Sequence, residues 1–274
     1  MFEVLAKEEL SPTTKLLRIN APDIAAKAKP GQFVIIRIDE KGERFPLTVA
    51  DWEREKGTIT LIFQELGVST RKLGKLDVRD EILNLVGPLG SPSEAKHHSS
   101  VAFVCGGVGT AAAYPIAKTL KEEGNEVTSI IGAKTKDLLI LENEMRRISN
   151  NLFVSTDDGS KGQQGFVSDV LKRLIEKDCG FSAVYAIGPP RMMKAVCQVT
   201  RPCCLKTIVS LNPIMVDGMG MCGACRVTVG GQTKFACLDG PLFDGHQVDF
   251  DELLKRLSMY TPQEKLALQL YENV

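Results

Sequence analysis

The sequence predicts an antiparallel β-barrel, then an α/β domain with a doubly wound parallel sheet, and a small C-terminal lobe. Three observations lead to this fold class. Short runs of β-branched and aromatic residues separated by turns fill residues 1–90, strands alternate with helix-length segments from residue 101, and Gly, Met and Cys dominate from residue 212. A chain of 274 residues is long enough for two compact domains.

The first part of the chain is predicted to be all β. Residues 33–38 and 58–63 are rich in β-branched and aromatic side chains, and glycine or charged clusters bound them, which is typical of strands. Such spacing without long helical patterns favours a barrel or a sandwich. The segment 91–100 (SPSEAKHHSS) is polar and aperiodic, so we interpret it as a linker in which His97 and His98 are solvated.

The second part of the chain alternates buried-type strands with helices, which predicts a parallel sheet covered on both faces. The expected strands are 101–105, 127–131, 152–155 and 183–187, and the expected helices are 110–123, 137–148, 167–177 and 190–199.

After residue 212 the alternation of strands and helices stops, and residues 251–271 again have a helical pattern. The expected domain limits are therefore a barrel (1–97), an α/β domain (98–211), a lobe (212–250) and a helical tail (251–274).

The composition excludes several classes of function. Lys plus Arg and Asp plus Glu both total 34, so no overall field recruits nucleic acid or an anionic membrane. No apolar stretch approaches the roughly 20 residues of a membrane helix, and the N-terminal MFEVLAKEEL has neither the basic start nor the apolar run of a signal peptide. We expect a soluble cytoplasmic protein.

The eight cysteines are unevenly distributed along the chain. In a reducing compartment they are expected to be metal ligands, redox groups or core residues rather than disulfides. Cys105, Cys179 and Cys197 are scattered among apolar neighbours, and we interpret them as core residues. Three others lie within 16 residues of one another: Cys222, Cys225 and Cys237.

A glycine-rich turn follows the strand 101–105 and opens the next helix. Glycines there permit a tight turn and close approach to a pyrophosphate, which the helix N-terminus attracts. A tight βα turn without a ligand is the alternative. The second strand runs into Lys134 without an acidic residue, so a conventional NAD site is not indicated and a 2′-phosphate stays conceivable. The candidate binding residues are Gly106, Gly107, Gly109 and Thr110.

Two further anion-binding patterns occur in the first part. Arg44 opens the run RFPLT and can bind a phosphate through two hydrogen bonds. Gly67, Ser69 and Thr70 stand at a predicted helix start, where backbone N–H groups and hydroxyls are available to an anion. A surface arginine and an ordinary helix cap are the plain alternatives.

The cysteine group has the spacing of an iron–sulfur site. Plant-type [2Fe–2S] ferredoxins use C-x4-C-x2-C with a distant fourth cysteine, and this chain has that spacing with an aspartate in the first position. A carboxylate can replace one thiolate, although Cys203 or Cys204 could supply the fourth sulfur instead. Zinc bound by the three cysteines and His246 is the rival site. The candidate ligands are Asp217, Cys222, Cys225 and Cys237.

In this order the motifs resemble the ferredoxin–NADP reductase superfamily. The resemblance implies FAD in the barrel and a nicotinamide nucleotide in the α/β domain, with Arg44 at the flavin pyrophosphate and Leu47 and Thr48 at the isoalloxazine. It also assigns a turn closing the barrel to residues 87–90. The other residues that it implies at the cofactors are Pro46, Gly67, Ser69, Thr70, Asp157, Asp158, Gly188 and Pro189.

With the lobe included, nearly the whole chain resembles two related families. One is the electron-transfer subunit of class 1B dihydroorotate dehydrogenase, which has four cysteines at its cluster. The other is the small subunit of NADH-dependent ferredoxin:NADP oxidoreductase, which carries aspartate in the first ligand position and the motif RFPLT. Because Asp217 and the run from Arg44 match the second family, we favour it.

This second resemblance implies a heterodimer with a larger subunit that carries FAD and [4Fe–4S] clusters, and it implies electron bifurcation between NADH, NADPH and ferredoxin. The expected cofactors of this chain are FAD, a [2Fe–2S] cluster and NAD(H), with NADP(H) possible. The tail after residue 251 would suit contact with the large subunit. No acid or base is expected to catalyse hydride transfer, because the protein's task is alignment. A dihydroorotate dehydrogenase subunit and a zinc-pinned flavin reductase acting alone stay open.

Overall fold

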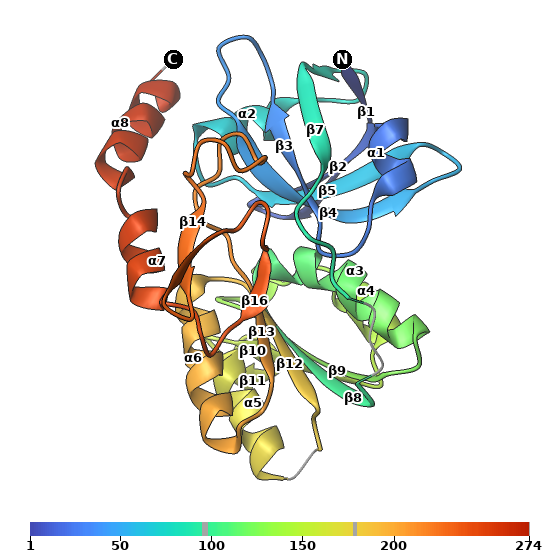
Figure 1. The fold of residues 1–274 in the computed structure, drawn as a ribbon. Helices are drawn as coiled ribbons and strands as arrows, with labels where there is room; N and C mark the ends of the chain where they lie inside the picture. The colour runs from blue at the N-terminus through green and yellow to red at the C-terminus, as the bar shows by residue number, and fades with distance from the viewer. Residues whose placement is uncertain (95–97, 178–179, 274) are drawn as a thin grey trace.

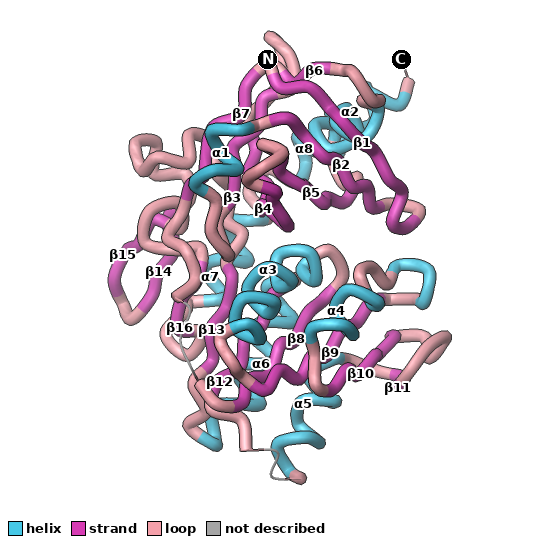
Figure 2. The backbone as a smooth tube through the Cα atoms, turned by 90° about the vertical axis from the view of Figure 1, so that its right-hand side faces the viewer, coloured by secondary structure: helices cyan, strands magenta, loops and turns pink. Residues whose placement is uncertain are grey.

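The computed structural model describes residues 1–94, 98–177 and 180–273. The N-terminal part forms a β-barrel, the middle of the chain an α/β domain, and the C-terminal helices run along one side of both (Figure 1). In the rotated view the helix α3 (Gly109–Glu122) lies at the side of the α/β domain that faces the barrel (Figure 2). The predicted fold class is confirmed.

The barrel sheet has seven antiparallel strands in the order β6-β1-β2-β5-β4-β3-β7. Because β6 and β7 are consecutive in the chain but lie at opposite edges of this order, the sheet curls into a nearly closed barrel. Its interior is filled by almost fully buried side chains such as Leu17, Ile59 and Phe63. The elements are β1 (Phe2–Ser11), β2 (Thr14–Asn20), α1 (Pro22–Lys27), β3 (Phe33–Arg37), β4 (Phe45–Glu53), β5 (Thr58–Gln64), α2 (Val68–Lys75), β6 (Glu81–Ile82) and β7 (Asn84–Leu89).

The second sheet has the order β11-β10-β9-β8-β12-β13-β16, and all its strands are parallel except β16. The chain first builds outward from β8 to β11 and then returns to add β12 on the other side of β8. The switch point between β8 and β12 is where α/β sheets of this kind bind ligands. The strands are β8 (Ser100–Gly106), β9 (Glu126–Ala133), β10 (Asn151–Thr156), β11 (Gln163–Gln164), β12 (Ala183–Ile187), β13 (Thr207–Ser210) and β16 (Leu242–Asp244).

Helices cover both faces of this sheet. Alternate residues of β8 belong to opposite layers: Val101 and Phe103 pack with α3 and α4, whereas Ala102 and Val104 pack with α5 and α6. The remaining helices are η1 (Lys136–Leu138), α4 (Glu142–Ile148), α5 (Val167–Glu176), α6 (Pro190–Thr200) and η2 (Arg201–Cys203).

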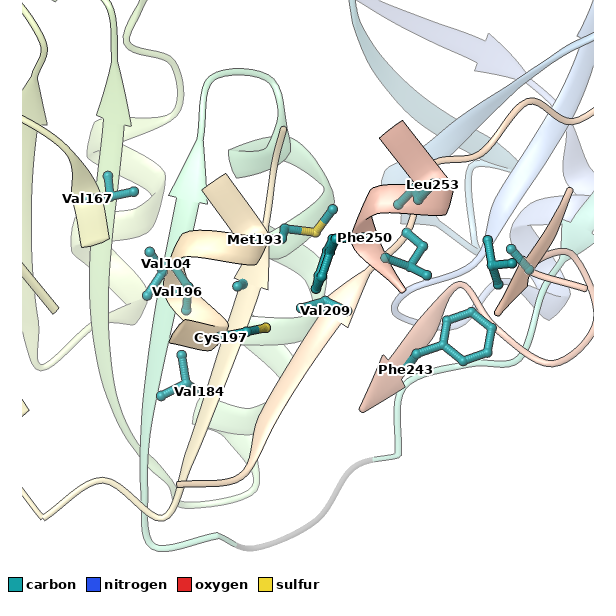
Figure 3. Packing of buried hydrophobic residues seen from close by; sticks show 14 of the residues in the cluster. Val104, Val167, Val184, Met193, Val196, Cys197, Val209, Phe243, Phe250 and Leu253 are labelled. Atoms are coloured by element: carbon teal, nitrogen blue, oxygen red, sulfur yellow. The ribbon is translucent and has the colours of Figure 1, made fainter. Parts of the chain in front are cut away.

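The C-terminal part adds a hairpin and two helices. Phe250 and Leu253 of α7 are buried in the same cluster as Met193 of α6 and Val209 of β13, and Figure 3 shows Phe250 beside the last two. The helix α8 lies against α2, where Arg71 forms an ion pair with Glu272. The elements are β14 (Arg226–Val229), β15 (Gln232–Phe235), α7 (Phe250–Leu257) and α8 (Thr261–Glu272).

The element prediction was wrong in one place and incomplete in others. The segment expected to be one helix at 137–148 forms the short η1 and then α4, because residues 139–141 leave the helix and Leu141 has a left-handed backbone with φ 55°. The strands β11, β13 and β16 were not predicted. The helical pattern at 251–271 is divided between α7 and α8.

Two of the scattered cysteines are core residues as predicted. Cys105 and Cys197 are buried, and burial raises the pKa of both thiols, that of Cys197 to about 12. Cys179 and His97 lie outside the described residues. His98 was predicted to be solvated, and this is wrong, because it lies half-buried with Nε2 3.5 Å from the hydroxyl of Tyr185.

None of the helices in the described part of the chain has the length and apolar character needed to cross a membrane.

Candidate functional site

The turn after β8 needs its glycines for different reasons. Gly107 has φ +54° and open space where a side chain would stand. A Cβ on Gly109 would lie 2.3 Å from the carbonyl oxygen of Ile187, so Gly109 allows α3 to pack closely on the end of β12. Thr110 is buried in the first turn of α3. The turn therefore leaves Gly107 accessible at a helix N-terminus, where an anion is favoured.

The loop after β12 meets this turn at the switch point. A Cβ on Gly188 would lie 3.0 Å from the backbone nitrogen of Gly106, and a Cβ on Gly106 would lie 3.0 Å from Pro189. Gly188 and Pro189, far from the turn in sequence, thus pack against it at the carboxyl ends of β8 and β12.

The loop after β10 borders the same edge of the sheet. The backbone N–H of Asp157 donates to Ala133 at the end of β9, and the carboxyl of Asp157 is exposed. Asp158 accepts hydrogen bonds from the hydroxyl (2.6 Å) and the backbone N–H (2.9 Å) of Ser160, which lower its pKa. Asp158 therefore shapes the turn, and the carboxylate of Asp157 is available to a ligand.

Sequence reasoning missed Glu142 at the start of α4. Its carboxylate binds Lys161 at 2.6 Å and Arg146 at 3.1 Å. Burial opposes ionisation of Glu142, but the hydrogen bonds from these two cations outweigh it, so the pKa lies below its usual value. The i,i+4 spacing of Glu142 and Arg146 was the available signal. Glu142 neutralises two cations near the loop after β10.

In the barrel, the loop before β4 and the start of α2 are joined. Arg44 is exposed, and its side chain forms no ion pair or hydrogen bond with any residue that the structure describes. Its neighbour Glu43 accepts a hydrogen bond of 2.8 Å from the hydroxyl of Ser69 in the first turn of α2. Arg44 is thereby held next to a helix N-terminus, a combination that suits a pyrophosphate.

The other predicted residues of this region have separate tasks. The hydroxyl of Thr70 accepts hydrogen bonds from the backbone N–H groups of Leu66 (3.0 Å) and Gly67 (3.1 Å), so it holds the turn into α2. A side chain on Gly67 would meet no atom within 4 Å, which leaves the helix start open. Three residues are half-buried on β4, paired with β3: Pro46, Leu47 and Thr48.

The loop 217–224 of the lobe packs on the barrel. Gly218 has φ +73°, and a Cβ there would lie 2.7 Å from Ile35 of β3 and 2.7 Å from Leu89 of β7. Asp217 accepts hydrogen bonds from the backbone N–H groups of Met219 (2.9 Å) and Cys222 (2.7 Å), and these lower its pKa. Asp217 therefore offers an ionised carboxylate, a suitable oxygen ligand for a metal, beside Cys222.

Two of the predicted sulfur ligands face each other. The sulfurs of Cys225 and Cys237 are 3.2 Å apart, and both residues are only 2% exposed, whereas Cys222 is exposed. Burial and the neighbouring thiol raise the pKa of Cys237 to about 12. The donors form one buried pair of sulfurs and one exposed thiol beside a carboxylate.

This arrangement suits a binuclear cluster better than a single ion. Within the ranges that the structure describes, no three His, Cys, Asp or Glu side chains are gathered around one point that could hold a metal ion. A structural zinc needs four ligands on one ion, whereas each iron of a [2Fe–2S] cluster takes two protein ligands. His246 of the zinc alternative is bound to the hydroxyl of Thr200 at 2.9 Å.

A carboxylate has about four acceptor positions, so Asp217 can bind iron and still accept backbone N–H groups. The alternative sulfurs are less well placed: Cys203 and Cys204 precede β13, whereas Asp217 follows it.

Comparison with known proteins extends these observations. Residues 212–249 match a family described as the iron–sulfur cluster binding domain of dihydroorotate dehydrogenase B, and residues 103–198 match an oxidoreductase NAD-binding domain. A protein of Thermotoga maritima named dihydroorotate dehydrogenase B (NAD(+)), electron transfer subunit homolog, is 49% identical over 98% of this chain and 95% of its own length. An electron transfer subunit of dihydroorotate dehydrogenase B from Desulforamulus reducens is 33% identical over 90% of this chain and 96% of its own length.

One solved structure is that of an NADH-dependent reduced ferredoxin-NADP oxidoreductase, described for its flavin-based electron bifurcation. A chain of that structure superimposes on this chain with a TM-score of 0.94. It is 48% identical, and the match covers 99% of this chain and 98% of that one. A ferredoxin NADP+ reductase from Neisseria gonorrhoeae with bound FAD and NADP matches with a TM-score of 0.61 at 19% identity, over 74% of this chain and 90% of that one, and so shares the fold.

Proposed function

Because the chain belongs to the family of dihydroorotate dehydrogenase B electron-transfer subunits and their homologues, we propose that it is the small subunit of an NADH-dependent ferredoxin–NADP oxidoreductase. It is an oxidoreductase with an NAD-binding domain and an iron–sulfur binding domain. One observation carries the proposal: the loop 217–224 of the lobe, which contains the candidate ligands Asp217 and Cys222, packs directly on barrel strands β3 and β7. This contact brings a one-electron site next to the domain that would hold the flavin.

FAD in the barrel would be held through its pyrophosphate and its ring. Arg44 and the open N-terminus of α2 would bind the pyrophosphate, and Leu47 and Thr48 on β4 would line the isoalloxazine. When bound, FAD would accept hydride from a reduced nicotinamide, and a [2Fe–2S] cluster would carry single electrons onward. The residues of the chain align the partners and exclude water, and none acts as an acid or base.

The nucleotide would lie across the switch point, with its pyrophosphate at Gly107 and its nicotinamide half beside Gly188 and Pro189. NADH is favoured over NADPH by the charges near the loop after β10. Asp157 offers a free carboxylate to a ribose hydroxyl, and Glu142 neutralises Lys161 and Arg146. Lys134, directly after β9, is exposed and leaves NADPH as the alternative. Flavin reduction rates with NADH and NADPH on one preparation test this preference.

The partner would be a larger subunit with FAD and [4Fe–4S] clusters, and the heterodimer would react with ferredoxin in a bifurcating complex of the cytoplasm. The helix α8 supports such a contact, because Leu266 and Leu270 stand one turn apart on it and are 57% and 62% exposed. An electron-transfer subunit of a class 1B dihydroorotate dehydrogenase is the second candidate, which the family match of residues 212–249 favours. The identity of the subunit that co-purifies with this chain decides between the two.

Substitution at Asp217 tests the cluster assignment. Asp217→Cys should retain a [2Fe–2S] cluster with a changed midpoint potential and changed g-values, because a thiolate replaces a harder oxygen donor. Asp217→Ala should leave a labile cluster. EPR spectra and iron content of the purified variants measure both effects.

Cys203→Ser and Cys204→Ser are the matched controls and should leave the spectrum unchanged. A wild-type spectrum in both Asp217 variants, combined with cluster loss in Cys203→Ser or Cys204→Ser, would show that the substituted cysteine is the fourth ligand in place of Asp217. Stoichiometric zinc in an EPR-silent wild-type protein would reject the electron-transfer function of the lobe.

A further inference from the structure

Two arginines bind the turn between Cys222 and Cys225. The guanidinium of Arg256 donates to the carbonyl oxygen of Ala224 at 3.1 Å, and that of Arg226 donates to the carbonyl oxygen of Gly223 at 3.3 Å. The backbone carbonyls of both residues between the two cysteines are therefore bound by positively charged groups.

The two contacts differ in kind. Arg226 is exposed and lies three residues from its acceptor, so its bond is local. Arg256 is half-buried and comes from α7, 32 residues further along the chain. Arg256 therefore provides the tertiary contact to the turn.

The position of Arg256 is firmly determined. Phe250 and Leu253 anchor α7 in the core, with exposures of 6% and 1%, and the carboxylate of Asp249 caps the helix by accepting the N–H of Glu252. α7 also contacts β14, which begins directly after Cys225, and Figure 1 shows the two side by side. The helix that carries Arg256 is therefore fixed against the core beside the turn.

The charge of Arg256 is not neutralised locally, because it forms no ion pair with any carboxylate in the part of the chain that the structure describes. The carboxylates of the lobe are otherwise engaged: Asp217 accepts from Met219 and Cys222, and Asp239 accepts from the backbone N–H of Phe235 at 2.7 Å.

We propose that Arg256 is a positioning residue of the iron–sulfur site, which holds the 222–225 turn and keeps a fixed positive charge beside it that raises the reduction potential of the cluster. The inference rests on the proposed function, since it requires the cluster in the lobe. Reduction adds one negative charge to the cluster, and a fixed cation nearby stabilises that charge more than it stabilises the oxidised form.

The test compares three variants of the full-length protein: Arg256→Gln, Arg256→Lys and Lys255→Gln. Lys255 is the matched control, because it is an exposed cation one residue away on the same helix with no bond to the turn. EPR-monitored redox titration gives the midpoint potential, and iron and acid-labile sulfide give the cluster content. We expect a more negative potential in Arg256→Gln, a potential close to wild type in Arg256→Lys, and no change in Lys255→Gln.

An unchanged potential in Arg256→Gln, or an equal shift in Lys255→Gln, overturns the proposal. If Arg256→Gln does not retain its cluster, recovery of cluster content in Arg256→Lys supports the proposal and equal depletion in Arg256→Lys overturns it. A wild-type protein without a [2Fe–2S] signal rejects the proposed function itself, whereas a normal wild-type cluster with an unaffected Arg256→Gln rejects only the role of Arg256.

Discussion

Gly107 and Gly109 have different roles in the same turn: Gly109 allows close packing, and Gly107 leaves room for a ligand. Gly109 lies against backbone atoms of the loop after β12, so a side chain there would push α3 off the sheet. Gly107 faces open space with φ +54°, where a methyl group would meet no protein atom. Sequence reasoning treated both glycines as parts of one phosphate motif, because the motif records glycine without recording what surrounds it. A substitution at Gly109 would therefore change both the stability of the fold and the binding of the nucleotide, and one measurement would not separate the two effects.

Gly107→Ala should weaken nucleotide binding while the fold is retained. The methyl group would enter the space that a pyrophosphate needs, and the left-handed backbone costs an alanine about 1–2 kcal/mol. We expect KM for NADH to rise roughly tenfold, which corresponds to about 1.4 kcal/mol, and flavin content to stay unchanged. Steady-state kinetics measure the first and absorbance spectra the second.

Gly109→Ala is the contrasting variant and should lower the thermal unfolding temperature, since its Cβ would lie 2.3 Å from the oxygen of Ile187. Equal KM values for NADH in wild type and in a folded Gly107→Ala variant would show that the pyrophosphate does not bind at this turn.

At the scale of elements, local pattern predicted the strands and helices whose partners are near in sequence. The four predicted strands of the α/β domain and the helices between them are present, apart from the first half of the segment 137–148. There, Ile140 is 4% exposed in a cluster with Ala50 and Ile62 of the barrel, so tertiary packing replaces the helical propensity. The antiparallel edge strand β16 escaped prediction because its pairing with β13 crosses the whole lobe.

Motif spacing identified the candidate cluster ligands and the candidate phosphate-binding residues, and the family resemblance implied the other binding residues. All these assignments stay predictions, as do the domain limits at 97, 211 and 250. Spacing could not show that Thr70 holds its own turn, that Glu142 binds Lys161, or that Arg256 reaches the cysteine turn. These contacts join side chains to distant or backbone atoms, which leave no periodic signal in the sequence.

The helix α8 is held to the barrel along one edge. Besides the ion pair of Arg71 with Glu272, the ammonium of Lys75 lies 4.5 Å from the ring centre of Tyr271. Its apolar residues Leu266 and Leu270 are turned away from these contacts and are exposed. The edge contacts orient the helix and leave Leu266 and Leu270 exposed, which is why we propose the partner contact there.

Leu266→Glu combined with Leu270→Glu should therefore reduce co-purification of the large subunit at least tenfold, because each substitution places a charge in a desolvated contact at a cost of about 1–3 kcal/mol. Flavin and iron contents should stay at wild-type levels. Gln269→Glu, which adds a charge to the neighbouring surface of α8, is the control. Full recovery of the complex with the double variant would place the subunit interface elsewhere.

For the whole molecule, the barrel contacts both other parts: α3 of the α/β domain contacts β4, and the lobe contacts β3 and β7. A flavin in the barrel would therefore adjoin both the nucleotide domain and the lobe. Hydride donors deliver two electrons together, which a one-electron cluster does not accept directly. The chemistry of the two carriers therefore requires a flavin for reduction of the lobe by NADH, although the lobe also adjoins the α/β sheet through β16.

Arg44→Ala should separate these steps. Loss of a charged hydrogen bond to the pyrophosphate costs about 1.5–3 kcal/mol, which weakens flavin binding roughly ten- to a hundredfold. In flavin-depleted protein, NADH should no longer produce the EPR signal of the reduced cluster, whereas dithionite should still produce it. Lys41→Ala, a change of another exposed cation in the same loop, should behave as wild type. Normal flavin affinity in Arg44→Ala, or reduction by NADH without flavin, would contradict this transfer through a flavin.

The way in which the lobe joins the sheet has a mechanical consequence. Its chain leaves the sheet after β13 and returns in β16, the strand paired with it, and the N–H of Leu211 donates to the carbonyl of Pro241 at 2.9 Å. The linker is tied to the same place, because the hydroxyl of Ser91 donates to the carbonyl of Leu238 at 2.8 Å. A module whose two ends are fastened together has no hinge on which to swing. Whatever the lobe carries is therefore held at a constant distance from the barrel, and an electron acceptor has to dock on the lobe to be reduced by it.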